Sequence, residues 1–143
     1  MKKIIGIGIL VVLVAGFFVW KFVNKKSADT NNEKPAFEMS FSELATAFKE
    51  PQTALEKYKT KLIAVQGNVL SITNEDTAMT IEIGNAEQEK SVVCQMDKRH
   101  LAELKNIKEG EPITIKGILT GYSDLSDLDI PSSIEMNFCN LKK

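Results

Sequence analysis

The side chains best suited to chemistry are two cysteines and one histidine, and their spacing argues against a catalytic or metal site. Cys94 and Cys139 lie 45 positions apart with no CxxC pair, and His100 is the only histidine. A tetrahedral zinc site takes about four ligands, so these residues are too few to hold the ion. No positioned partner would make His100 a general base, and the apolar neighbours of Cys94 indicate a buried, inert thiol. We therefore predict no catalytic residue, no metal and no cofactor.

The two cysteines fit a structural role better. An even number of cysteines in an exported domain favours one disulfide, and in the chain-entropy model a Cys94–Cys139 bridge would stabilise the fold by roughly 3–4 kcal/mol. One detail opposes it. Cys94 shares the alternation of Val92 and Met96, whereas Cys139 is out of phase with Phe138, which we expect in the core. The bridge therefore requires a bulge or turn after Phe138, and two free buried thiols are the alternative.

Charged side chains supply two further candidate sites. Asp124, Asp127 and Asp129 lie in one acidic stretch, but their spacing does not match the alternating acids, central glycine and distal glutamate of an EF-type calcium loop. We interpret this stretch as a solvated loop. The candidate ligand face is a second group, with three basic residues around one predicted strand and a later aromatic residue: Lys90, Lys98, Arg99 and Tyr122. A solvated charge cluster is the alternative for this group.

The N-terminus carries a membrane anchor by our interpretation. Ile4 to Val23 is an apolar run interrupted only by Lys21, and at about 1.5 Å per residue its 20 positions span roughly the 30 Å of bilayer hydrocarbon. Aromatic residues gather at its end, as at a membrane interface. A cleaved secretory signal has a shorter apolar stretch and small residues at the cleavage site. That signal and a buried soluble helix are the alternatives, and we favour export of the domain that follows.

Separating the anchor from the rest changes the charge of the domain. Five of the 18 basic residues lie at or before Lys26, and all 19 acidic residues lie after it. The remainder therefore holds 13 basic against 19 acidic side chains, a formal charge of −6. Nucleic-acid binders draw most of their affinity from neutralising phosphates, so this balance counts against nucleic acid as the partner.

The elements that must position these residues follow from periodicity and turn signals. We divide the chain into an anchor over residues 1–26, a polar linker over 27–38 and one domain over 39–143. A capping box at Ser40 and Glu43 starts a helix, and a second at Thr53 and Glu56 starts another. In chain order we then predict strands over 61–72, 77–83 and 91–96, a helix capped by Asp97, and strands over 112–119 and 134–138.

Five strands with a helix between the third and fourth is the order of an OB-fold, a small closed Greek-key barrel. The first strand changes phase near Gly67-Asn68, which predicts a bulge that bends it to serve both sides of the barrel. The fold class is thus mainly β with α, with a helix before the barrel and one transmembrane helix. An open α+β meander is the alternative.

The chain also resembles the tRNA_anti-like family of small bacterial OB-fold proteins, which often carry an N-terminal membrane or export segment. The matching residues include Val65-Gln66-Gly67-Asn68-Val69, Val93-Cys94-Gln95-Met96, Ile115-Lys116-Gly117 and Cys139. The resemblance implies the fold and no particular ligand.

These observations predict a membrane-anchored, non-enzymatic OB-fold binding or assembly module displayed outside the cytoplasm, in the periplasm or extracellular space. Its partners are the lipid bilayer, through Ile4 to Val23, and a protein, peptide or glycan bound on the second and third strands or on the loop from Tyr122 to Ser133. Nucleic-acid binding is the alternative function, and the scarcity of aromatic residues on those strands disfavours it.

Overall fold

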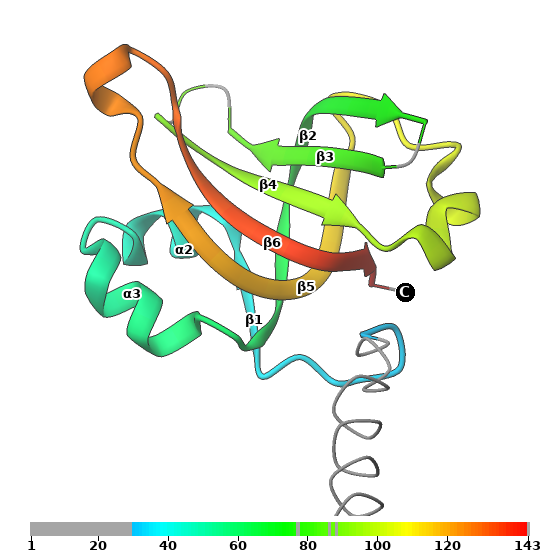
Figure 1. Cartoon of the computed structure of the whole chain (residues 1–143), viewed down its shortest axis with the longest axis horizontal. Coiled ribbons are helices and arrows are strands. Elements are labelled where there is room, and N and C mark those ends of the chain that lie inside the picture. The colour runs from blue at the N-terminus through cyan, green and yellow to red at the C-terminus, as the bar shows by residue number, and fades with distance from the viewer. Residues whose placement is uncertain (1–29, 77, 86, 88, 143) are drawn as a thin grey trace, which may run out of the picture.

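The computed structural model describes residues 30–76, 78–85, 87 and 89–142, so the predicted anchor at Ile4 to Val23 lies outside the described residues. The elements in chain order are β1 (Phe37–Ser40), α2 (Phe41–Ala47), α3 (Pro51–Tyr58), β2 (Leu62–Glu75), β3 (Ala78–Gly84), β4 (Lys90–Met96), the 3₁₀ helix η1 (Lys98–Leu104), β5 (Pro112–Ser123), the 3₁₀ turn η2 (Ser126–Leu128) and β6 (Ser132–Leu141) (Figure 1). Within the described part of the chain, no helix is long and apolar enough to cross a membrane.

Strands β2 to β6 close into a barrel. They lie in the order β2-β3-β4-β6-β5, and a further pairing of β2 with β5 closes the ring (Figure 1). Strands β4 and β6 are parallel, while the pairs β2–β3, β3–β4, β2–β5 and β5–β6 are antiparallel. With η1 between β4 and β5, this is the predicted OB-fold topology.

The first barrel strand bends to serve both sides, as predicted. Residues 62–68 of β2 pair with β5, and residues 68–75 pair with β3. The register shifts between Val69 and Ser71, slightly beyond the glycine that suggested a bulge. Gly67 marks a close approach, because a Cβ atom there would meet the Cβ of Phe41 at 3.2 Å.

Two helices before the barrel cover one of its ends (Figure 1). The predicted capping box is present at the start of α2, where the Glu43 N–H donates to Ser40 Oγ and the Glu43 carboxylate accepts from the Ser40 N–H at 2.7 Å. The second predicted box, at Thr53 and Glu56, is wrong. Helix α3 instead begins at Pro51 with no side-chain cap, because proline suits the first helical position, where the missing N–H has no partner to lose.

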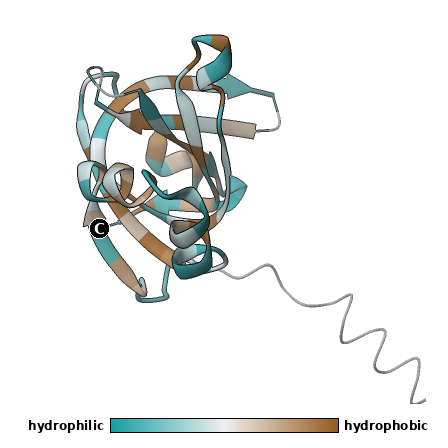
Figure 2. Ribbon diagram, turned by 90° about the vertical axis from the view of Figure 1, so that its left-hand side faces the viewer, coloured by the Kyte–Doolittle hydropathy of each residue, from teal (hydrophilic) through white to brown (hydrophobic). Residues whose placement is uncertain are grey.

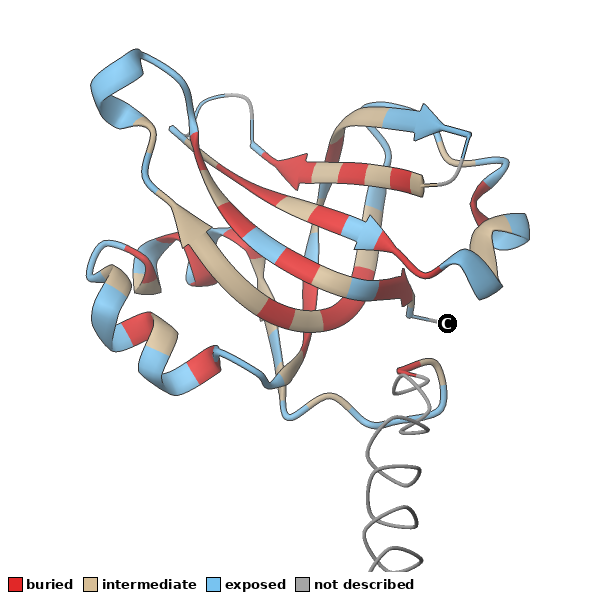
Figure 3. Cartoon of the chain, viewed as in Figure 1, coloured by how far each residue is buried: buried red, intermediate tan, exposed pale blue. Residues whose placement is uncertain are grey.

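The core lies inside the barrel and under α2. Buried residues alternate with less buried ones along the strands (Figure 3), and hydrophobic residues alternate with hydrophilic ones along the ribbon (Figure 2). This alternation is the period of two that a pleated strand imposes. The fully buried side chains include Ile63, Val65, Ile81, Ile83, Ile115, Leu119, Ile134 and Met136.

Strand β6 breaks this alternation at Phe138. The residue has a left-handed backbone (φ 53°) and its side chain is 41% exposed, while the next residue, Cys139, is fully buried. Our expectation that Phe138 fills the core is therefore wrong. Phe138 is one extra residue in β6 relative to β4. Cys94 therefore pairs with Met136, but Met96, two residues later, pairs with Cys139. The irregularity that a Cys94–Cys139 approach required is thus present, in Phe138 itself.

Cys94 and Cys139 are both buried free thiols in the structure. The disulfide expected between them is not formed there, which corresponds to the alternative of two free buried thiols. Burial, together with the adjacent Cys94 thiol, raises the pKa of the Cys139 thiol well above its ordinary value. A thiol that ionises so reluctantly is a poor nucleophile and a slow partner in disulfide exchange.

The segment predicted as a linker over 27–38 is in part a piece of the domain. Strand β1 pairs in parallel with β2, with Phe37 opposite Ile63. The rings of Phe37 and Tyr58 pack in a T-shaped arrangement, with their centroids 5.1 Å apart. The ammonium group of the buried Lys116 donates to the backbone carbonyls of Asn31 and Glu33, which precede β1. Polar composition concealed this packing, because within this segment the strand pairing and the contacts with Lys116 are made by backbone groups.

Candidate ligand-binding face

The outer surface of strands β3, β4 and β6 is the candidate ligand-binding face. Alternate residues of these strands point into the core, so the others form one exposed face. Register places Thr80 opposite Gln95 and Glu82 opposite Val93, while Val93 lies beside Glu135. The outward positions of the face are thus Thr80 and Glu82 on β3, Val93 and Gln95 on β4, and Glu135 and Asn137 on β6.

The centre of this face is neutral to acidic. Ser71 Oγ donates to the Glu82 carboxylate at 3.0 Å, and Ser123 Oγ donates to the Glu135 carboxylate at 2.7 Å. Both carboxylates are therefore held against the sheet by neighbouring strands. The side-chain amides of Gln95 and Asn137 differ from them, because neither makes a hydrogen bond within the described residues. They remain available to donate to and accept from a ligand.

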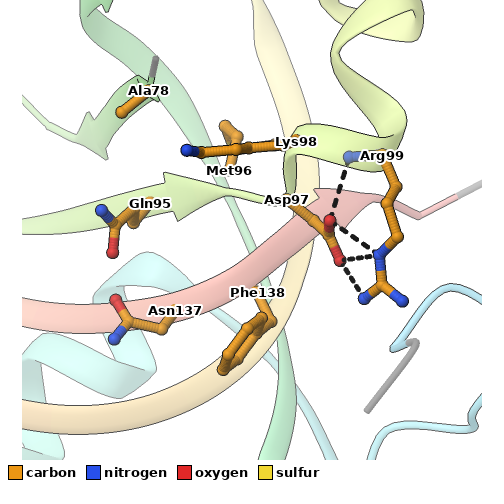
Figure 4. Close-up of a pocket in the computed structure, with 8 residues that line it drawn as sticks. All are labelled: Ala78, Gln95, Met96, Asp97, Lys98, Arg99, Asn137 and Phe138. Atoms are coloured by element: carbon orange, nitrogen blue, oxygen red, sulfur yellow. Dashed lines mark hydrogen bonds and ion pairs between the residues drawn. The ribbon is translucent and has the colours of Figure 1, made fainter. Parts of the chain in front are cut away.

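A hollow of about 480 Å³ ends the face near the last residues of β4. It is lined by Ala78, Gln95, Met96, Asp97, Lys98, Arg99, Asn137 and Phe138 (Figure 4). The left-handed backbone of Phe138 turns the ring out of the core to the rim of this hollow. A bulky residue in this conformation is uncommon, and such strain collects at functional sites.

Asp97 has a structural role at the same place. It is the N-cap of η1, where its carboxylate accepts from the Arg99 backbone N–H at 3.0 Å, and it also accepts from Arg99 Nε at 2.9 Å. Figure 4 shows the guanidinium turned toward this carboxylate. The hydrogen bonds from Arg99 are the main cause that holds the pKa of Asp97 below its ordinary value. The charge of Arg99 is thereby largely neutralised, whereas Lys98 makes no ion pair with any described residue.

The four residues named from sequence fall into two groups at opposite ends of β4. Lys98 and Arg99 line the hollow beside Phe138, whereas Lys90 and Tyr122 line another of about 420 Å³ next to the β5–β6 connection. A strand of seven residues separates them by roughly 20 Å. Tyr122 also faces inward, with its ring 5.2 Å from that of Phe48. The four therefore border one face without forming one site.

Sequence reasoning missed the three residues that define the hollow best. Gln95 and Asn137 are uncharged, so neither produced a charge signal, and the family resemblance that includes Gln95 implied no role for it. Phe138 did produce one, because its phase conflicts with that of Cys139. If this conflict is interpreted as a displacement of Phe138 from the alternation of the strand, it predicts that the Phe138 ring lies outside the core. Among the described residues, no group of three potential metal ligands exists.

The tRNA_anti-like family model matches residues 1–128. The chain belongs to the tRNA_anti-like family. No curated protein sequence matches it.

Among solved structures, a proposed nucleic acid-binding lipoprotein from Klebsiella pneumoniae subsp. pneumoniae aligns with a TM-score of 0.56 and 16% identity, over 74% of this chain and 91% of that one. At this identity the likeness establishes the OB-fold only. An OBody bound to hen egg-white lysozyme aligns at 0.44 and 15% identity, over 61% of this chain and 85% of that one. An asparaginyl-tRNA synthetase of Entamoeba histolytica aligns at 0.41 and 15%, over 58% of this chain and 21% of the enzyme.

Proposed function

We propose that this chain is a membrane-tethered, non-enzymatic binding module that holds its ligand on the outer face of β3, β4 and β6. One observation carries the proposal. The side-chain amides of Gln95 and Asn137 stand without partners among the described residues, beside the hollow at one end of the surface on which OB-folds bind their ligands. Directed hydrogen-bonding groups on a rigid sheet give a ligand orientation without requiring a charge.

The composition of the face favours a protein, a peptide or a glycan. Glu82 and Glu135 place negative charge beside the amides, and the portion beyond Lys26 carries a formal charge of −6. A polyanion would be repelled there. Amide groups, by contrast, match the backbone of a peptide and the hydroxyls of a sugar. The apolar run Ile4 to Val23 would hold this face at the bilayer, with the domain outside the cytoplasm.

Single-stranded nucleic acid is the second candidate. Phe138 supplies an exposed aromatic ring, and Lys98 supplies a cation at the same hollow. These are the two components of a stacking site for a base. The Klebsiella pneumoniae lipoprotein that shares the fold is itself a proposed nucleic acid-binding protein.

The test compares what full-length chains retain from detergent-solubilised membranes, with nuclease added to a parallel sample. The double variant Gln95→Ala/Asn137→Ala removes both amides, and Gln52→Ala removes an exposed amide on α3 as a matched control. We expect a nuclease-resistant ligand that wild type and control retain and the double variant loses. A nuclease-sensitive ligand, confirmed by salt-dependent binding of an oligothymidine probe, would favour the second candidate. Identical retention by all three chains would contradict a site on this face.

A further inference from the structure

The start of the described chain is fixed to one end of the barrel. Thr30 is fully buried, and its hydroxyl donates to the backbone carbonyl of Phe138 at 2.6 Å. The side chain of Asn140, also buried, donates to the same hydroxyl at 2.7 Å. Thr30 therefore lies beside the last residues of β6, immediately next to Phe138, and Figure 1 shows the start of the described chain (blue) near the C-terminus.

The next residues are fixed as well. Lys116 on β5 is buried, and its ammonium group donates to the carbonyl of Asn31 at 2.8 Å and to that of Glu33 at 2.9 Å. Hydrogen bonds from a charged donor are stronger than those from a neutral one. Residues 30–33 are thus part of the barrel's rigid body, and they cannot serve as a flexible spacer.

Little chain remains between this fixed point and the predicted anchor. Only residues 24–29 separate Val23 from Thr30. At about 3.5 Å per residue, that length spans at most roughly 25 Å even when fully extended. Thr30 therefore lies within about 25 Å of the end of the predicted anchor, which makes the end of the barrel that carries Thr30 and Phe138 the part of the domain nearest to it.

We propose that Phe138 and Lys98 form the barrel's own contact with the bilayer that carries it. The Phe138 ring enters the interfacial region, where aromatic side chains are favoured, and the Lys98 ammonium group pairs with anionic lipid headgroups. This assignment explains why a large apolar side chain is kept 41% exposed in a strained backbone conformation. It rests on the tethering part of the proposed function. The contact would hold the outer sheet face at a fixed height above the lipid, open to ligands at the membrane surface.

The opposite end of the barrel provides a control. Leu128 is 66% exposed in η2, in the connection that leads into the start of β6, whereas Phe138 lies near that strand's end. Figure 1 shows η2 (orange) at the far side of the barrel from the start of the described chain (blue). If exposed apolar residues simply sought lipid, Leu128 would serve as well. The tether geometry predicts that only Phe138 reaches it.

Depth-dependent quenching tests the contact on the full chain in vesicles. Trp20 is the only tryptophan, so Trp20→Phe supplies a silent background for Phe138→Trp or, as the control, Leu128→Trp. In phosphatidylcholine–phosphatidylglycerol vesicles with brominated acyl chains, we expect the indole of Phe138→Trp to lose emission and shift to the blue, and that of Leu128→Trp to do neither. If Phe138→Trp fails to fold, Asn137→Trp carries the probe at the adjacent position. No quenching at either end, or equal quenching at both, would overturn the proposal.

Charge provides a second readout. In the same background, Lys98→Glu should reduce the quenching of Phe138→Trp in vesicles containing phosphatidylglycerol, whereas the exposed Lys105→Glu should not. Equal effects of the two charge reversals would remove Lys98 from the contact. Flotation with the vesicles separates the two proposals. A chain that does not float has no anchor, which contradicts the tethering itself. A floating chain with an unquenched probe contradicts only the Phe138 contact.

Discussion

The substitution Phe138→Asn tests whether Phe138 is an exposed residue in a strained backbone conformation or a residue of the core. Phe138 is 41% exposed, so the buried part of its ring is worth roughly 1–2 kcal/mol of the 1.5–3 that full burial would give. Its left-handed backbone costs about 1–2 kcal/mol for an ordinary L-residue, and asparagine tolerates this conformation well. The two effects nearly cancel. We expect the free energy of unfolding to change by less than about 1 kcal/mol.

The assay is equilibrium urea unfolding of the detergent-solubilised full chain, followed by circular dichroism. Phe48→Ala is the matched control, because Phe48 is 1% exposed in the same core and truncating a buried phenylalanine costs about 3–5 kcal/mol. The hydrogen bond from Thr30 to the Phe138 carbonyl involves the backbone and survives the substitution. A loss of 3 kcal/mol or more in Phe138→Asn would show that the ring is a core residue after all and would refute this reasoning.

Three further outcomes follow from the barrel. Gly117→Ala should destabilise the fold by about 1–3 kcal/mol in the same urea assay, because its methyl group would overlap the Cys139 sulfur; an unchanged midpoint would show that the thiol can move. Cys94 and Cys139 should both resist alkylation in the folded chain and both react after unfolding without reductant, whereas two unreactive thiols in the unfolded chain would demonstrate the disulfide. Hydrogen bonds from Arg99 lower the pKa of Asp97. The stability that the ionised carboxylate contributes is therefore complete above pH 3.8, the ordinary value, and is lost as pH falls through the lowered pKa. Asp97→Asn should flatten this part of the stability–pH curve.

The order of elements was predictable because it rests on local signals. The capping box at Ser40, the alternation in β3 and β4 and the Asp97 cap each depend on neighbours within a few residues. The bend in β2 was predictable too, since one strand with two phases must face two partners. Strand β1 and the buried Thr30 were not. They are held by backbone pairing and by side chains more than 80 positions away, and no local pattern encodes such partners.

The site was harder to predict than the fold, for a physical reason. Sequence analysis selects charged and aromatic residues as candidates, yet here these groups largely interact with other residues of the protein. Arg99 is engaged by Asp97, and Tyr122 packs on Phe48. The groups left over at the hollow are two neutral amides, one phenylalanine and Lys98. Whether such groups are available depends on which partners the fold provides, and that is a property of three-dimensional packing.

Phe138 links the thiols, the tether and the outer face through one backbone conformation. Its left-handed turn returns Cys139 to the core beside Gly117 and leaves its carbonyl for Thr30. A glycine at position 138 would satisfy both of these structural demands at lower conformational strain. The fold therefore requires the turn but gives no reason for an aromatic ring there. That surplus, at the end of the barrel nearest to the proposed tether, is the strongest sign that this end of β6 has a function beyond closing the barrel.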